Sequence, residues 1–274
     1  MGRFISCRAL GLVIAVGLSL CGRAFGWGYA SAVVSYDQGT NRFQFNSYTN
    51  PSVALGLPQT NPGDGVATTP FNNPFSPNDV VSVGLGGELT LQLSTPASCT
   101  DPRPQIGVFA FQQFVQQPSG GTNGGPALFY PSIQADVNVS SDGNNWVSLN
   151  GGNPIVFDIP ANAFADVAAT QASNYGQPFT GNLASLANEP NEAATLAAYG
   201  GSAGGTWLNV SGTGLGEVNF IRFSVPATYA FSFQLDAVTV SNEATITEIP
   251  EPGIVVVMPM LGWMLLRTRG RNAE

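Results

Sequence analysis

The side chains that could do chemistry in this chain are almost all carboxylates, amides and hydroxyls. The 274-residue sequence contains no histidine, and its basic residues are all arginines. The Ser-His and Cys-His nucleophile systems, the common zinc sites and lysine Schiff-base chemistry therefore each lack a required residue. Paired carboxylates could still hydrolyse a glycosidic bond, but no spacing in the sequence identifies such a pair. We expect a non-catalytic protein, and a carbohydrate-active hydrolase that uses paired carboxylates is the alternative.

Aromatic side chains form a second group of candidates, because their faces could stack on sugar rings. Trp146 and Trp207 each lie inside a strand pattern, where packing in the core is the competing interpretation. Tyr130 and Tyr175 lie in predicted loops. From this group we take Trp146, Trp207 and Tyr130 as candidate contacts for an extracellular polysaccharide.

The C-terminal end of the chain combines three features in a fixed order. Pro250, Glu251 and Pro252 precede an apolar run over residues 253–266, and the arginines Arg267, Arg269 and Arg271 follow it. The run has 14 residues, about 21 Å as a helix against roughly 30 Å of hydrocarbon, which suits a temporary anchor. Arginines stay on the cytoplasmic side, so the preceding chain should lie outside. This order resembles the PEP-CTERM sorting signal of Gram-negative bacteria, which implies processing by an exosortase; a plain membrane helix is the alternative.

The N-terminal end is typical of an export signal. Arg3 and Arg8 give a positive start, and the apolar core over residues 9–20 is too short to span a bilayer permanently. Small residues before Trp27 suit cleavage by signal peptidase. The predicted organisation is a signal peptide at residues 1–26, a β-sandwich domain at 27–248 and a sorting tail at 249–274.

The composition of the predicted exported part excludes some partners and one kind of crosslink. Residues 27–250 carry three arginines against fifteen carboxylates, a formal balance of −12. Such a surface repels phosphate backbones, which excludes nucleic acid as a partner. Cys99 is the only cysteine there, so no intramolecular disulfide can form. We expect a loop or half-buried thiol at Cys99, with an intermolecular disulfide as the alternative.

The pattern between the two ends is one of short strands separated by turns. Apolar and polar residues alternate over residues 89–93 and 133–140, which predicts strands with one buried face. The Ser-Asp-Gly-Asn-Asn segment at 141–145 predicts a tight hairpin with Asp142 in the turn. A short helix is expected at 192–199 with Asn191 as its N-cap. Further strands are expected at residues 30–36, 80–83, 106–111, 146–149, 155–159, 207–210, 218–225 and 231–240. Together they predict an all-β, antiparallel sandwich with long loops and short surface helices.

Several segments, in this order, resemble a family of exported, PEP-CTERM-tagged bacterial surface proteins. They are residues 33–36, 51–56, 75–84, 86–91, 137–146, 220–223 and 235–238. The hairpin at 140–146 and the Ile-Arg-Phe strand at 221–223 are also similar to discoidin-like, galactose-binding jelly rolls. The resemblance implies a jelly-roll β-sandwich and a role at the cell surface or in the biofilm matrix.

The same resemblance implies a metal site. Jelly rolls of this kind often hold a structural ion near the final strand, and Ca²⁺ takes hard oxygen ligands. On that basis Asp236 is the first candidate ligand for a structural Ca²⁺, followed by Asp37 and Asp101. The competing interpretation of Asp236 is a strand-end carboxylate bonded to backbone amides. Within residues 101–111 the chain departs from the family, since Val108 stands where relatives carry an acidic residue.

Taken together, these features predict an exported protein of the cell surface or extracellular matrix of a Gram-negative bacterium. Its expected partners are signal peptidase, an exosortase-type enzyme and an extracellular polysaccharide, with transient tethering to the inner membrane. We expect it to act without catalysis.

Overall fold

The computed structural model describes residues 28–41, 47–61, 66–115, 127–128, 133–187, 189 and 191–241. The predicted signal peptide at 1–26, the sorting tail at 249–274 and the candidate Tyr130 lie outside the described residues. Within the described ranges, no helix has both the length and the apolar character needed to cross a bilayer.

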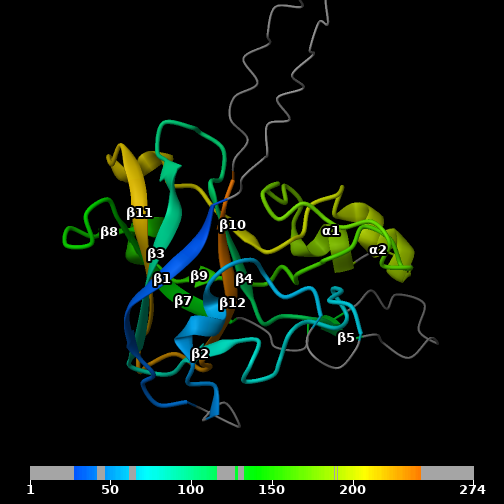
Figure 1. The fold of residues 1–274 in the computed structure, drawn as a ribbon, viewed down its shortest axis with the longest axis horizontal. Coiled ribbons are helices and arrows are strands. Elements are labelled where there is room, and N and C mark those ends of the chain that lie inside the picture. The colour runs from blue at the N-terminus through cyan, green and yellow to red at the C-terminus, as the bar shows by residue number, and fades with distance from the viewer. Residues whose placement is uncertain are drawn as a thin grey trace, which may run out of the picture.

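Ten of the described strands form one curled antiparallel β-sheet (Figure 1). In order across the sheet its strands are β10 (Thr206–Leu208), β4 (Ile106–Ala110), β12 (Phe233–Val240), β1 (Gly28–Asp37), β3 (Gly87–Ser98), β11 (Glu217–Val225), β7 (Gln134–Ser140) and β8 (Val147–Ser148). Two short strands pair beside this path: β2 (Val81–Val83) with β12, and β9 (Ile155–Val156) with β7. A separate pair joins β5 (Phe114–Val115) to β6 (Ala127–Leu128). The prediction of an all-β, antiparallel fold is confirmed.

Strand β1 joins the two halves of the sheet. Its first residues, Gly28 and Tyr29, pair with β12, and from Ala30 onward it pairs with β3. The register between β1 and β3 shifts twice, between Ala30 and Ala32 and between Val33 and Ser35. Such bulges bend a strand and increase its twist, which lets the sheet curl at this point. We call β2, β4, β10 and β12 the β12 half, and β3, β7, β8, β9 and β11 the β11 half.

The two halves enclose one apolar core. Leu89 and Ile221 from the β11 half belong to the same cluster of buried residues as Val108 and Leu235 from the β12 half. The link is direct at two rings that come from strands not paired with each other. Phe223 of β11 stacks on Phe233 of β12, with their ring centroids 5.1 Å apart.

Local sequence patterns account for the β11 half. In β3 the leucines at 89, 91 and 93 are buried, and β7 alternates buried and half-buried residues, as predicted from its sequence. The hairpin between β7 and β8 is also confirmed, because Asn138 pairs with Ser148. In its turn, Asp142 accepts hydrogen bonds from the backbone N–H groups of Asn144 and Asn145, each at 2.8 Å.

The outer side of the β12 half is covered by residues 158–205, which we call the covering segment. Phe109 of β4 packs there against Tyr175, with their ring centroids 5.5 Å apart. The hydroxyl of Thr239 on β12 donates to the Tyr175 carbonyl at 2.9 Å. In Figure 1 the part of this segment that carries the helices extends beyond β4 and β10, away from the β11 half. Because β4 and β12 are thus covered on both faces, their residues are buried throughout.

Short helices occur where the sequence predicted them. The covering segment contains α1 (Leu183–Ala187) and α2 (Glu192–Ala198). Asn191 is the N-cap of α2, since its side-chain oxygen accepts from the Ala194 N–H at 3.0 Å. Three single-turn 3-10 helices lie in loops: η2 (Pro51–Ala54), η3 (Leu149–Gly152) and η4 (Ser211–Thr213).

Strands that are neighbours in the sequence do not always pair in the sheet. Strands β2 and β3 flank the turn at residues 84–86, yet they do not pair with each other: β2 pairs with β12, and β3 with β1 and β11. The strand predicted at 155–159 is also shorter, because β9 ends at Val156 and the chain then turns into the core at Phe157.

Candidate functional site

Asp236 lies where the register between β12 and β4 shifts, and it is 3% exposed. Both carboxylate oxygens accept from the Gln59 backbone N–H, at 3.3 and 3.2 Å. Burial raises the pKa of Asp236 well above its usual range, the Gln59 bond opposes this rise, and the charge of Asp79 adds to it. The contacts fit the interpretation of a carboxylate bonded to the backbone.

The groups closest to Asp236 do not complete a cation site. Asp79 is itself occupied, since one of its oxygens accepts from the Ser76 hydroxyl at 2.6 Å and from the Ser76 N–H at 3.3 Å. Burial, followed by the charge of Asp236, raises the pKa of the Tyr175 hydroxyl, so this group stays protonated. Calcium requires about six to eight oxygen ligands. Among the described residues, no three carboxylate or thiol side chains lie close enough to share an ion.

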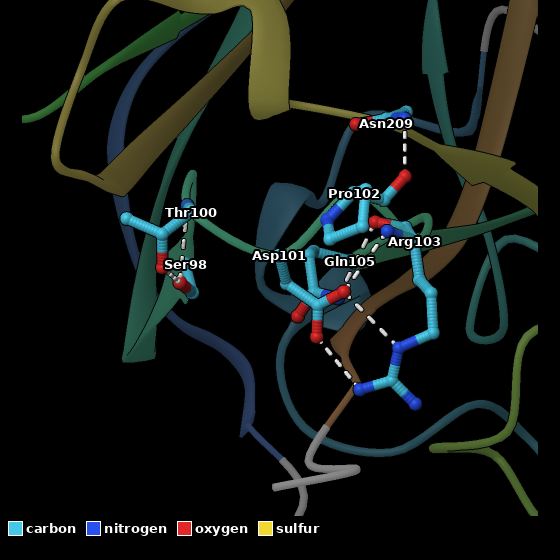
Figure 2. Close-up of polar contacts among 7 residues, drawn as sticks. All are labelled: Ser98, Thr100, Asp101, Pro102, Arg103, Gln105 and Asn209. Atoms are coloured by element: carbon cyan, nitrogen blue, oxygen red, sulfur yellow. Dashed lines mark hydrogen bonds and ion pairs between the residues drawn. The ribbon is translucent and has the colours of Figure 1, made fainter. Parts of the chain in front are cut away.

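Asp101 is engaged by a neighbouring arginine (Figure 2). The Arg103 guanidinium donates to both carboxylate oxygens, with Nη2 2.6 Å from Oδ2 and Nε 3.1 Å from Oδ1. These side-chain bonds, followed by the bond from the Arg103 N–H, lower the pKa of Asp101. Asn209 fixes the same loop by donating to the Pro102 carbonyl at 2.8 Å, as Figure 2 shows. The guanidinium thus occupies the side of Asp101 that a metal ion would need.

Asp37 lies at the exposed end of β1, and its carboxylate closes a local turn. One oxygen accepts from the Gly39 backbone N–H at 3.0 Å. Asp37 pairs across the sheet with Glu88 of β3. The structure therefore places Asp37 at the end of β1, Asp101 in the loop after β3 and Asp236 within β12 beside Gln59, and no contact joins the three among the described residues.

Trp207 packs against the sheet. Its indole N–H donates to the Gly204 carbonyl at 2.9 Å, and its ring lies against Gly107 of β4. The approach is close enough that a Cβ at Gly107 would lie 2.8 Å from Cζ2 of the indole. One face of this ring is therefore covered by β4, which favours the packing interpretation.

Trp146 lies instead against the only arginine of the described strands. The Arg222 guanidinium carbon is 3.8 Å from the centroid of the Trp146 ring, in cation–π geometry. The Nε atom of Arg222 is also 3.5 Å from a Glu88 carboxylate oxygen. Trp146 comes from the β7–β8 hairpin, so the hairpin reaches back over the outer side of β11.

Strand register aligns polar side chains around this pair. Residues directly opposite each other in an antiparallel sheet point to the same side. The outward positions of the β11 half and of the adjoining end of β1 thus form two rows, the first with Ser35, Thr90, Arg222, Asn138 and Ser148, and the second with Asp37, Glu88, Ser224 and Asp136. We call these nine residues together with Trp146 the polar face.

Hydrogen bonds within the polar face hold several of its side chains in place. The Ser148 hydroxyl donates to Asn138 Oδ1 at 2.5 Å, and the Ser224 hydroxyl donates to Glu88 at 3.3 Å. Tyr229, from the loop between β11 and β12, donates its hydroxyl to Asp136. Burial and then this bond raise the pKa of Tyr229 to about 12. These bonds fix part of the polar face.

Sequence reasoning names two members of this face, Trp146 for sugar contact and Asp37 for metal binding, but misses its centre. Arg222, Glu88 and Asn138 were not proposed, although one signal was present: Arg222 is one of only three arginines in residues 27–250, and it stands in an alternating strand.

Cys99, just beyond β3, is a free and buried thiol. It is 5% exposed, and the Thr213 hydroxyl lies 3.5 Å from its sulfur. Such burial disfavours the intermolecular disulfide that the sequence left open.

The chain matches no protein-family model, and no curated protein is similar to it.

Proposed function

We propose that this chain is an exported, non-catalytic protein that a Gram-negative cell sorts to its surface or extracellular matrix. One observation carries the proposal: a Pro-Glu-Pro motif, an apolar run and an arginine cluster follow one another at residues 250–271. The export signal at residues 1–26 agrees with it. An exosortase-type enzyme would process the tail after the rest of the chain has crossed the inner membrane.

The fold that we propose in finer detail is a jelly-roll β-sandwich. It is supported by the way the two halves of the curled sheet share one core, with Phe223 against Phe233. Two sheets that pack face to face through their inner side chains define a sandwich. The resemblance to PEP-CTERM-tagged and discoidin-like proteins supports the same assignment.

The hydrolase alternative gains nothing from the buried carboxylates. Asp236 and Asp79 interact electrostatically, and a raised pKa is typical of a general acid. Asp236 is however 3% exposed and Asp79 7% exposed, and Asp79 is bonded to Ser76. Both carboxyl groups are therefore closed to a polymeric substrate in this structure.

The sorting proposal is tested by following the chain through the cell. Expression in a Gram-negative host that has an exosortase should give a shortened, surface-accessible product. Alanine at Pro250, Glu251 and Pro252 together should leave the chain unprocessed and in the inner membrane. Asn272→Ala, beyond the arginine cluster, is the control and should be sorted normally. Intact chain in the cell interior, with both ends present, would contradict the proposal.

A further inference from the structure

The polar face presents one fixed hydrogen-bond donor among several acceptors. Arg222 contacts both the Trp146 ring, at 3.8 Å, and the Glu88 carboxylate, at 3.5 Å, and its side chain is 27% exposed. A guanidinium is a planar fork of donors, and holding it in place in advance lowers the entropy cost of binding. Trp146 therefore acts as a positioning residue, since one face of its ring is already taken.

Acceptors surround this donor on the neighbouring strands. Glu88 lies on β3, and Asn138 lies directly opposite Arg222 on β7. The hydroxyls of Ser224 and Ser148 already donate to Glu88 and Asn138, so their oxygens add further acceptors. Donors and acceptors interleaved on one surface match a ligand rich in hydroxyl groups, because each hydroxyl can also do both.

The charge of the face determines which hydroxyl-rich ligand fits. Asp37, Glu88 and Asp136 place three carboxylates around the single guanidinium, and the chain as a whole has a formal charge of −8. An acidic polymer would be repelled by this surplus. An uncharged polymer avoids the repulsion, and the carboxylates can accept hydrogen bonds from its hydroxyls.

We propose that the polar face binds an uncharged polysaccharide, with Arg222 as donor and with Glu88 and Asn138 as acceptors. This inference rests on the proposed function, because such a ligand is met at a cell surface or in a matrix. The extent of the face supports a chain-like ligand: its two rows cross four or five neighbouring strands, which lie about 4.8 Å apart.

The test uses native gels cast with a soluble polysaccharide, on which binding appears as slower migration of the purified full-length protein. Dextran, galactomannan and xyloglucan are the neutral polymers, and alginate is the acidic one. We expect retardation by at least one neutral polymer and none by alginate. Arg222→Gln should weaken that binding by about tenfold, since it removes charged hydrogen bonds.

Arg103→Gln is the matched control. It removes the same charge, so mobility in the absence of polymer changes equally, but Arg103 lies in the loop after β3 and pairs with Asp101. Its binding should stay within about twofold of the parent protein, a difference well under 1 kcal/mol. If Arg222→Gln does not fold, as judged by thermal unfolding, Asn138→Ala provides a second variant of the face and should also lose binding.

Two results with the variants would overturn the inference: unchanged binding in folded Arg222→Gln, or equal loss of binding in both arginine variants. Two results with the parent protein would also overturn it: retardation by alginate alone, or retardation by none of the polymers. These results are separate from the sorting test. A correctly sorted protein that binds none of the polymers defeats only the inference about the face. A protein that binds a neutral polymer but is never exported defeats only the sorting proposal.

Discussion

Carboxylates of this chain fall into two groups with opposite environments. Asp142 and Asp166 lie in exposed turns, where hydrogen bonds from nearby groups lower their pKa values. Asp236 and Asp158 are removed from water, and burial raises their pKa values. The difference follows first from burial and then from the number of donors: Asp142 accepts from two backbone N–H groups and an amide, whereas within the described residues the bonds to Asp236 come from the Gln59 N–H. An aspartate in the sequence therefore does not by itself indicate a metal ligand.

Replacing Asp236 with asparagine should stabilise the protein at neutral and higher pH. The folded-state pKa of Asp236 lies above its unfolded value of about 3.9, so the folded state holds a proton that the unfolded chain releases. Stability is then lost as pH rises above about 4. The asparagine amide oxygen would still accept from Gln59 without needing a proton. We expect the Tm of Asp236→Asn at pH 8 to exceed that of the parent by on the order of 2–4 °C, with little difference near pH 4.

The same experiment separates this interpretation from a calcium site. Thermal unfolding would be followed with a chelator and with excess Ca²⁺, and Glu217→Gln, which changes an exposed carboxylate outside the candidate ligands, serves as control. We expect no effect of Ca²⁺ on the parent protein. A Ca²⁺-dependent rise in Tm that Asp236→Asn abolishes would show that Asp236 is an ion ligand.

Among the elements, β4 depends on the small size of one residue. Gly107 lies between the Trp207 ring of β10 and the Thr239 hydroxyl of β12, so all three strands of this edge meet at one position. A Cβ there would be 2.8 Å from both Thr239 Oγ1 and Trp207 Cζ2. Neither side chain can move away easily, because each also makes a hydrogen bond. Thr239 donates to the Tyr175 carbonyl, and Trp207 donates to the Gly204 carbonyl.

Gly107→Ala should therefore destabilise the protein by about 1–3 kcal/mol, the usual cost of overpacking. Urea unfolding measures the change. Gly216→Ala is the control, since a Cβ at Gly216 would meet nothing within 4 Å. Equal stability of the two variants would mean that Trp207 is not held against β4.

Elements could be predicted from the sequence where the interactions that form them lie within a few residues of the chain. The alternation in β3 and β7, the turn at Asp142 and the N-cap of α2 each arise within a few residues, and all were predicted. The pairing of β2 with β12 arises between positions about 150 residues apart, and no local pattern encodes it. The polar face was missed for the same reason: Arg222, Glu88 and Asn138 become neighbours only through strand register.

At the scale of the whole molecule, the two faces of the curled sheet have different roles. The inner sides of both halves form one apolar core, and the outer side of the β12 half is covered by the covering segment. The outer side of the β11 half carries the polar face. A ligand surface on this side would be supported by a core that spans both halves. Whether the two halves fold as one unit can therefore be tested.

A double-mutant cycle at Phe223 and Phe233 tests whether the halves fold as one unit. Both rings are fully buried, and they stack with centroids 5.1 Å apart although their strands do not pair. Each Phe→Ala change should cost about 3–5 kcal/mol, with unfolding in urea still a single transition. The double variant should lose less than the sum, because the ring–ring contact, worth about 0.5–1.5 kcal/mol, can be removed only once.

Phe223 combined with Phe179, which belongs to a different buried cluster, is the control and should be additive within about 0.5 kcal/mol. Additive costs at Phe223 and Phe233, or two separate transitions, would show that the halves of the sheet are stabilised independently, and the sandwich proposed here would then lose its central support.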